Sequence, residues 1–254
     1  MNTHDTFIKE LQGFSGSKVL LIKSLNDFII RKIDNIERNY EKLVLLKNHN
    51  FLVPEIIDKD KNILDMEYIH GQDMKNFFKL EDIKKFTKFV IDTMSRFKSI
   101  GEKLKDYTPV YSSQLSFFDG DTSLPFNTND LLEKLPKFIP TSLCHGDFTL
   151  DNIIYKEDSN FYMIDPVTGV YDSWVFDIAK MRQDIEGKWF LRNSSNMSEY
   201  DLALSYIKKE LMNVFPECFN DYLYILMLLR VYKYSQKGTK EQKMLLEEIK
   251  RVWK

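Results

Sequence analysis

Cysteine is nearly absent from the 254-residue sequence, which contains only Cys144 and Cys218. Their positions suggest neither a disulfide framework nor a zinc site. The four histidines are scattered and show no metal-ligand spacing. We therefore expect two buried free thiols in a reducing compartment and no metal site built from cysteine and histidine.

Long hydrophobic runs are missing as well. The longest lies near residues 222–229, which is too short to span a bilayer. The N-terminal segment MNTHDTFIKELQ is polar and lacks the apolar core of a signal peptide. These two absences favour a cytoplasmic protein that has no membrane partner.

Neither sign of charge dominates, because 36 basic residues face 38 acidic ones and the net charge is −2. A broad electrostatic attraction to nucleic acid or anionic lipid is therefore not expected. The sequence is 43% hydrophobic and 29% charged, which is ordinary for a globular protein. Its length suffices for one large domain or two modest lobes.

Predicted strands dominate the first 70 residues. Two apolar, β-branched segments flank a turn signal at Asn26-Asp27, and a second turn is expected at 58–61. A helical period of apolar residues lies between these hairpins. The predicted elements are strands at 17–24 and 26–34, a helix within 35–50, and two strands within 51–71.

The rest of the chain is mostly helical in pattern. A helix over 80–101 is expected to end at Gly101, residues 106–130 read as a loop, and a short helix begins at Asn129 or Asp130. Two short strands, 152–156 and 161–165, precede four helical segments. We predict an α+β fold with two lobes, a small β-rich N-terminal lobe (1–70) and a larger helical C-terminal lobe (71–254).

One stretch, LCHGDFTLDNIIY at 143–155, carries an unusual set of polar residues. Asn152 follows Asp147 by five positions, which is the D-x-x-x-x-N spacing of a kinase catalytic loop. Asp165 closes the next strand, FYMID. Asp and Asn supply hard oxygen ligands of the kind that Mg²⁺ prefers. The pattern therefore indicates phosphoryl transfer.

HGDFTLDN resembles the H-G-D-x-x-x-x-N motif of the aminoglycoside phosphotransferase and choline kinase superfamily, which has the protein-kinase-like fold. MIDP (163–166) is similar to that family's metal-binding segment, and WVFDIAKMRQ (174–183) is similar to the helix that follows it. The resemblance is specific over residues 143–183 and covers nearly the whole chain in element order. It implies a bilobal, ATP- and Mg²⁺-dependent phosphotransferase.

The resemblance also assigns roles. It makes Asp147 the catalytic base and Asn152 and Asp165 the Mg²⁺ ligands. His145 belongs to the same loop and is expected to brace it through hydrogen bonds rather than to react. Asp177 is expected to hold this loop from the following helix.

The N-terminal lobe should hold the nucleotide. GFSGSKV places Gly13, Ser15 and Gly16 before the first predicted strand, where backbone N–H groups can cover phosphates. In the family the hinge strand between the lobes, here Met66 to Ile69, offers backbone groups to adenine. Glu67, Tyr68 and Ile69 are the residues expected there.

In the family a cationic residue on the third strand contacts the phosphates, and on the matching strand here, FIIRKID, Arg31 and Lys32 are the two candidates. Strand side chains alternate between faces, so only one points inward. We favour Arg31, because an inward Lys32 would bring Asp34 to the same inner face. Lys32 would then point to water, but it remains the alternative.

That cation usually pairs with a helix glutamate. Glu37 and Glu41 share one face of the next helix, and we prefer Glu41. A solvated acidic face is the competing interpretation for both.

The acceptor of the phosphoryl group is expected to bind to the C-terminal lobe. Asp184, Glu186 and Trp189 in DIEGKWFLRN could line its pocket, and Trp189 could equally be packing. A sugar or a small alcohol, including an amino alcohol, is the leading acceptor. A catalytically silent kinase-fold binding module is the alternative, as is an aminoglycoside or choline kinase specifically. A protein-serine kinase is disfavoured, since no A-P-E segment follows IDP. The oligomeric state stays open.

Overall fold

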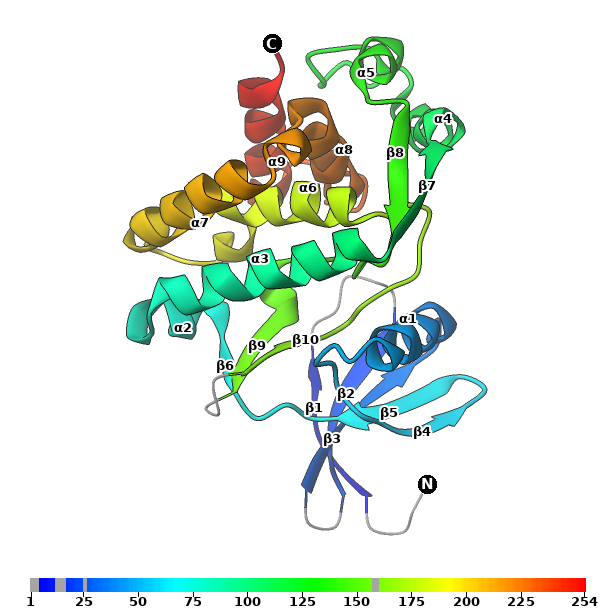
Figure 1. Ribbon diagram of the computed structural model, residues 1–254, viewed down its shortest axis with the longest axis vertical. Coiled ribbons are helices and arrows are strands. Elements are labelled where there is room, and N and C mark those ends of the chain that lie inside the picture. The colour runs from blue at the N-terminus through cyan, green and yellow to red at the C-terminus, as the bar shows by residue number, and fades with distance from the viewer. Residues whose placement is uncertain (1–4, 12–16, 25–26, 157–159) are drawn as a thin grey trace. The chain divides into compact units, whose positions relative to one another are not determined.

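The computed structural model describes residues 5–11, 17–24, 27–156 and 160–254. Contacts between Cα atoms divide the chain into two compact units. The first comprises the described residues of 1–77 and 152–169, and the second comprises 78–151 and 170–254 (Figure 1). The first unit is built mainly of strands and the second mainly of helices, as the sequence predicts. The predicted boundary at residue 70 leaves 152–169 with the second lobe, whereas in the structure this segment groups with the first unit.

A five-stranded antiparallel sheet forms the first unit, in the order β1-β2-β3-β5-β4. Its strands are β1 (Asp5–Leu11), β2 (Lys18–Ser24), β3 (Asp27–Ile33), β4 (Ile56–Asp60) and β5 (Ile63–Glu67). β3 ends where Asp34 and Asn35 adopt left-handed backbone conformations with φ of 64° and 52°. Asp and Asn tolerate this conformation better than other non-glycine residues. They turn the chain into α1 (Glu37–Asn48), whose Leu43 and Leu46 are fully buried.

A smaller sheet completes the first unit, in the order β10-β9-β6. Its strands are β6 (Gln72–Asp73), β9 (Ile153–Lys156) and β10 (Asn160–Met163). The ring of Phe77 packs 4.8 Å from Tyr155 and 5.2 Å from Phe161, measured between centroids. Gly71 is required next to this sheet, because a Cβ there would lie 2.4 Å from the carbonyl oxygen of Tyr155.

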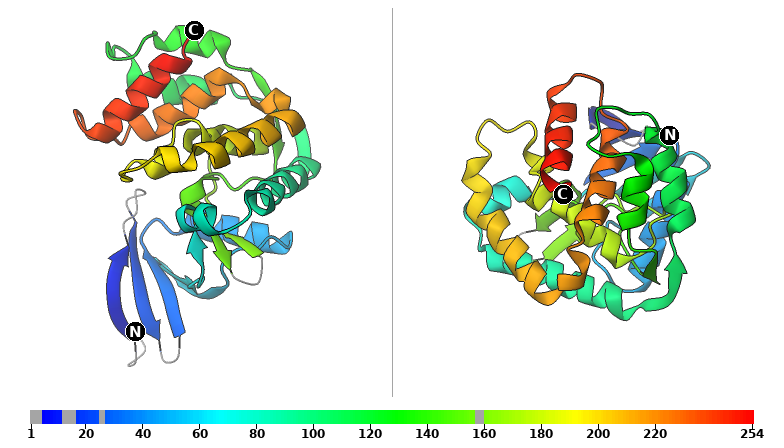
Figure 2. Two further views of the ribbon diagram at one scale, coloured as in Figure 1. Left: turned by 90° about the vertical axis from the view of Figure 1, so that its left-hand side faces the viewer. Right: turned by 90° about the horizontal axis from the view of Figure 1, so that it is seen from above.

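Helices dominate the second unit. α2 (Met74–Leu80) carries the chain into it, and its further elements are α3 (Ile83–Ser99), β7 (Gly101–Asp106), α4 (Thr108–Leu115), η1 (Ser116–Phe118), α5 (Thr128–Lys134), β8 (Phe138–Ser142), η2 (Leu150–Asn152), α6 (Trp174–Ile185), η3 (Trp189–Leu191), η4 (Ser198–Tyr200), α7 (Asp201–Val214), η5 (Pro216–Cys218), α8 (Asp221–Tyr232) and α9 (Lys240–Val252). Every residue of α6 is buried, because α3, α7 and α8 all pack against it. The right-hand view of Figure 2 shows α9, in red, beside α8. A helix that is covered on all sides in this way is a rigid support for any loop that it holds.

Several predicted boundaries in the first unit are wrong. The turn expected at 58–61 lies further along the chain, because β4 continues through Asp60 and pairs with β5. β1 was not expected at all, since its residues are mostly polar and exposed. An edge strand needs few apolar side chains, so its sequence resembles a loop.

Boundaries also differ in the second unit. Gly101 does not cap α3, since Ile100 is the C-cap and Gly101 begins β7. Residues 106–130 contain α4 as well as loop. α5 begins one turn early because Asn127 caps it, and Asp130 completes a reciprocal capping box rather than serving as the cap.

The two cysteines follow the sequence prediction, since Cys144 and Cys218 are both buried and neither forms a disulfide. In the part of the chain that the structure describes, no helix is both long and apolar enough to cross a membrane.

Candidate active site

The hairpin β9–β10 brings Asn152 and Asp165 to the same end. Ile153 at the start of β9 pairs with Met163 at the end of β10, so the residues just outside the hairpin become neighbours. The backbone N–H of Ile164 donates to the carbonyl oxygen of Asn152 over 2.9 Å. Antiparallel pairing thus gathers two positions that are thirteen apart in sequence.

The carboxylate of Asp165 is held from two other elements of the first unit. Lys32 on β3 donates from Nζ to Oδ1 over 2.7 Å, and Asn39 on α1 donates from Nδ2 to the same oxygen over 2.8 Å. Asn39 also reaches the carbonyl oxygen of Pro166. Asp165 has a φ of 52°, a sparsely populated conformation that persists where surrounding contacts fix it. Its side chain is 46% exposed, so a cation can reach it.

Lys32, rather than Arg31, faces Asp165. The prediction that Lys32 points to water is wrong, because its side chain is only 3% exposed. Arg31 instead makes a buried two-pronged ion pair with Asp65, its neighbour on β5, over 2.7 and 2.6 Å. The argument from Asp34 fails for a local reason: the strand ends at Ile33 and the left-handed Asp34 leaves the sheet.

Neither glutamate of α1 pairs with these cations among the described residues. Glu41 is exposed and accepts a hydrogen bond from the hydroxyl of Thr168. Glu37 forms an ion pair with Lys59. The preference for Glu41 is therefore wrong as a contact, and Asn39 is the polar residue of α1 that the structure brings to Lys32 and Asp165.

The other residues predicted to bind the nucleotide are those of the glycine-containing loop and those of the adenine-binding segment. Gly13, Ser15 and Gly16 lie outside the described residues. In the predicted adenine-binding segment, the Glu67 N–H donates to the Glu55 carbonyl and Ile69 is buried. Tyr68 packs edge-on against His70 with ring centroids 4.7 Å apart.

The predicted catalytic loop, residues 145–150 of the second unit, is held by Asp177, as expected. The carboxylate of Asp177, at the start of α6, accepts the backbone N–H of His145 over 2.5 Å and that of Gly146 over 2.9 Å. Gly146 adopts a φ of 87°, which glycine tolerates without cost. His145 is fully buried, and its Nδ1 accepts the N–H of Asp147. His145 therefore braces the loop from within.

Two further residues of α6 continue this contact along the loop. Lys180 lies 3.1 Å from Asp147, between Nζ and Oδ1. Asp184 accepts the backbone N–H of Leu150 over 2.7 Å. Asp177, Lys180 and Asp184 are spaced by three and four residues, so they share one face of the helix. Along this face, successive residues of α6 contact successive residues of the loop at 145–150.

The charge around Asp147 keeps it ionised. Burial raises the pKa of its carboxyl, but the positive charges of Lys180 and Arg230 outweigh this and hold the pKa below its usual value. Lys180 is nearly buried, whereas the side chain of Asp147 is 34% exposed. A carboxylate that is ionised, oriented and reachable can accept a proton from a bound hydroxyl.

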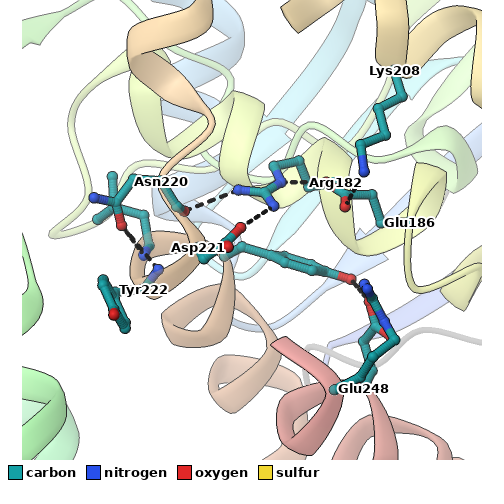
Figure 3. Close-up of polar contacts among 10 residues, drawn as sticks. Arg182, Glu186, Lys208, Asn220, Asp221, Tyr222 and Glu248 are labelled. Carbon is teal, nitrogen blue, oxygen red and sulfur yellow. Dashed lines mark hydrogen bonds and ion pairs between the residues drawn. The ribbon is translucent and has the colours of Figure 1, made fainter. Parts of the chain in front are cut away.

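The residues expected to contact the acceptor are used inside the fold instead. Asp184 is fully buried, accepts a second N–H from Phe190, and has a pKa raised to about 7 by burial and by Asp151. Glu186 binds Arg182 and Lys208 (Figure 3). Trp189 is buried beneath the guanidinium of Arg192. The expectation that they line an acceptor pocket is therefore wrong for Asp184 and Glu186.

Figure 3 also shows what Arg182 does. Its guanidinium donates to the carbonyl oxygen of Asn220 over 3.0 Å and to Asp221 over 2.7 Å, in addition to Glu186. These contacts tie the end of α6 to the start of α8. The cluster is structural, because its charges are matched within the second unit.

Sequence reasoning missed Lys180, Asn39 and Arg230. Lys180 had a visible signal, since a lysine inside the apolar helix WVFDIAKM, three residues after Asp177, must find a buried partner. Asn39 and Arg230 had no comparable signal. Their neighbours become apparent only when α1 and α8 are packed.

The described residues contain no cluster of three His, Cys, Asp or Glu side chains that could hold a metal ion. The donor chemistry of Asn152 and Asp165 still fits Mg²⁺, which takes few protein oxygens and keeps several waters. Asp147 lies in the second unit and Asn152 in the first, and four residues of the chain, 148–151, separate them.

Solved structures with the same arrangement of elements are kinase-like phosphotransferases. Three that match are a mutant of the aminoglycoside phosphotransferase APH(4)-Ia in complex with AMP-PNP and hygromycin B, the choline kinase LicA from Streptococcus pneumoniae, and an ethanolamine kinase from Plasmodium vivax. Their TM-scores are 0.65, 0.55 and 0.55, at identities of 10%, 16% and 13%. The alignments cover 97%, 97% and 98% of this chain and 92%, 93% and 81% of theirs. At such identities the likeness shows the fold, which is protein-kinase-like.

Fold and site thus define a kinase-like transferase. The model of the phosphotransferase enzyme family matches residues 13–194, which is well over half of the chain. The chain belongs to the phosphotransferase enzyme family. No protein of curated function matches its sequence.

Proposed function

We propose that this phosphotransferase moves the γ-phosphoryl group of ATP to a hydroxyl of a small molecule, with Mg²⁺ as cofactor. The observation that carries the proposal is the arrangement at Asp165, where a buried Lys32 and the end of the Asn152 hairpin meet one reachable carboxylate. Nucleotide phosphates need such a pairing of cation and metal ligand. A similar fold holds AMP-PNP in the APH(4)-Ia complex.

Each residue has a role in the proposed reaction. Lys32 steadies the phosphates, and Arg31, the earlier choice, serves the sheet through Asp65. Asn152 and Asp165 would hold Mg²⁺, which neutralises charge on the phosphates when bound. Backbone groups of Glu67, Tyr68 and Ile69 are proposed to contact adenine.

The transfer itself needs one base. The acceptor hydroxyl oxygen bonds to the γ-phosphorus as the bond from that phosphorus to the β,γ-bridging oxygen breaks, and ADP leaves. The hydroxyl proton passes to the carboxylate of Asp147, which Lys180 and the Asp177-braced loop hold in place.

The acceptor is proposed to be a sugar or another small alcohol. We place the protein in the cytoplasm, where ATP is available and where buried free thiols such as Cys144 and Cys218 stay reduced. A silent binding module is disfavoured, because such a module has no need for an intact Asp147, Asn152 and Asp165.

Asp147→Asn tests the proposal. The substitution should lower turnover by about 10²–10⁴-fold, the usual contribution of general base catalysis, while the affinity for ATP stays within a few fold. Turnover is measured as Mg²⁺-dependent ADP release with a library of small hydroxyl compounds, and affinity by calorimetry.

Asp92→Asn is the matched control, because Asp92 is an exposed carboxylate on α3 that pairs only with Lys88 among the described residues. Equal turnover in Asp147→Asn and wild type would remove Asp147 from the role of base. A wild-type protein that binds no ATP would favour the binding module.

A further inference from the structure

Arg230 on α8 is a half-buried arginine without a carboxylate partner among the described residues. Its guanidinium lies 5.0 Å from the centre of the Tyr171 ring. Its hydrogen bond in the described structure runs from Nη1 to the sulfur of Met227 over 3.3 Å, and sulfur is a weak acceptor. A guanidinium has five N–H donors, so Arg230 can still donate to a group that binds beside it.

Other arginines of the second unit contrast with it. Arg182 donates to Asp221, Arg192 to Asp151, and Arg251 to Glu248. A partly buried cation usually needs an anionic partner to offset its desolvation. Arg230 has no carboxylate within ion-pair distance among the described residues, where its recorded contacts are Tyr171 and Met227, so its guanidinium is available to an anionic group that binds beside it.

Arg230 also belongs to the surroundings of Asp147. α6 and α8 pack against each other, and the charges of Lys180 on α6 and Arg230 on α8 both act on the Asp147 carboxyl. Two cations therefore face one carboxylate. The acidic residues that might have balanced them, Asp184 and Glu186, are occupied with backbone N–H groups and with other cations.

We propose that Arg230, whose charge acts on Asp147 together with that of Lys180, binds an oxyanion on the acceptor, so that the substrate is a hydroxyl compound that carries a phosphate or carboxylate group. This inference rests on the proposed kinase activity and deepens it. The planar fork of arginine matches both groups through two parallel hydrogen bonds. An acceptor with an ammonium group would meet net positive charge, so amino alcohols and aminoglycosides should be poor substrates.

Two matched acceptor series test the inference on the full-length chain with Mg²⁺-ATP. The first is glycerol 3-phosphate, glycerol and 3-amino-1,2-propanediol, and the second is glucose 6-phosphate, glucose and 6-amino-6-deoxyglucose. Within each series only the substituent at one carbon changes, from phosphate to hydroxyl to ammonium. In the series that is phosphorylated, kcat/KM should be at least tenfold higher for the anionic member than for the cationic one.

Arg230→Gln and Arg230→Lys locate the effect. Arg230→Gln should lower the ratio of kcat/KM for the anionic acceptor to kcat/KM for the cationic acceptor by at least tenfold. The cause should be a higher KM for the anionic acceptor, while KM for ATP stays unchanged. Arg230→Lys should keep part of the preference, because lysine retains the positive charge. Lys88→Gln removes one exposed positive charge from α3 and should keep the preference. Calorimetry with inorganic phosphate gives a readout without turnover, and wild type should bind it more tightly than Arg230→Gln.

The possible failures are distinct. Preference for the ammonium acceptors, or a preference that Arg230→Gln leaves intact, would overturn the inference while the kinase activity stands. A change confined to KM for ATP would assign Arg230 to the nucleotide and also overturn it. Absence of ATP binding by the wild type would instead overturn the proposed function, and the inference with it.

Discussion

Arg31 and Lys32 are sequence neighbours of like charge with different tasks. Alternation along β3 sends them to opposite faces of the sheet. Arg31 meets Asp65 inside the sheet, and Lys32 meets Asp165 at the site. The sequence shows two adjacent positive charges but not which of them faces the site. The choice between them depends on where β3 ends, because Asp34 lies beyond the strand and does not share a face with Lys32.

Substituting each by methionine should separate the two tasks. Arg31→Met leaves Asp65 buried without its partner, so the free energy of unfolding should fall by about 3–5 kcal/mol. Lys32→Met leaves behind a carboxylate that is about half exposed, so the loss of stability should be smaller, while kcat/KM for ATP should fall by at least tenfold. Urea unfolding and steady-state kinetics measure the two quantities. If Arg31→Met lowered kcat/KM for ATP more than Lys32→Met does, with both variants fully folded in the assay, Arg31 and not Lys32 would be the residue that contacts the phosphates.

At the scale of elements, α6 organises the predicted catalytic loop, residues 145–150. Its residues Asp177, Lys180 and Asp184 lie on one face and contact the loop at successive positions. Because α6 is buried all round, the loop inherits the rigidity of the core. Positioning by a buried helix is a general way to fix catalytic geometry.

Asp184 makes this element sensitive to pH. Burial raises its pKa from 3.8 to about 7 in the folded protein. Between these values the folded state keeps a proton that the unfolded chain releases, so the contribution of Asp184 to stability falls as pH rises through this window. The full shift corresponds to on the order of 4 kcal/mol.

Asp184→Asn should abolish that dependence. The amide of Asn cannot ionise. It also has one acceptor oxygen instead of two for the N–H groups of Leu150 and Phe190, and this loss lowers the free energy of unfolding by an amount that does not vary with pH. The free energy of unfolding of the wild type minus that of Asp184→Asn should therefore decline between pH 4 and pH 7, as measured by urea titrations without nucleotide or metal. A difference that stays flat or rises would mean that Asp184 is ionised in the folded protein.

Much of this organisation could be predicted from the sequence. The hairpin 152–165 and the four C-terminal helices have clear periodicities, and the Asp147–Asn152 spacing points to the loop chemistry. β1 could not be predicted, because polar edge strands resemble loops, and the start of α5 was misplaced because Asn127, Asn129 and Asp130 are all good caps. The contacts of Arg230 and Asn39 could not be predicted, because they depend on packing between elements that are distant in sequence.

At the scale of the whole molecule, the predicted ligands of the nucleotide and metal lie in one unit and the base lies in the other. Lys32, Asn152 and Asp165 all belong to the first unit. Ligand binding should therefore stabilise that unit directly.

Mg²⁺-ATP at about 100 times its Kd should raise the free energy of unfolding by about 2.7 kcal/mol, since it binds only the folded state. Thermal unfolding with and without nucleotide measures this, and EDTA should remove most of the gain. Asp165→Ala should respond to ATP equally with or without Mg²⁺. An undiminished Mg²⁺ effect in that variant would exclude Asp165 as a ligand.

The two cysteines give the molecule a built-in reporter. Both lie in the second unit, and Cys144 directly precedes His145, with its thiol 3.8 Å from the Tyr171 carbonyl oxygen. A thiol reagent reaches such a group only when the surrounding structure opens. The labelling rate of Cys144 thus measures how often the loop at 145–150 separates from α6, without any engineered label and without a signal from the five-stranded sheet of the first unit.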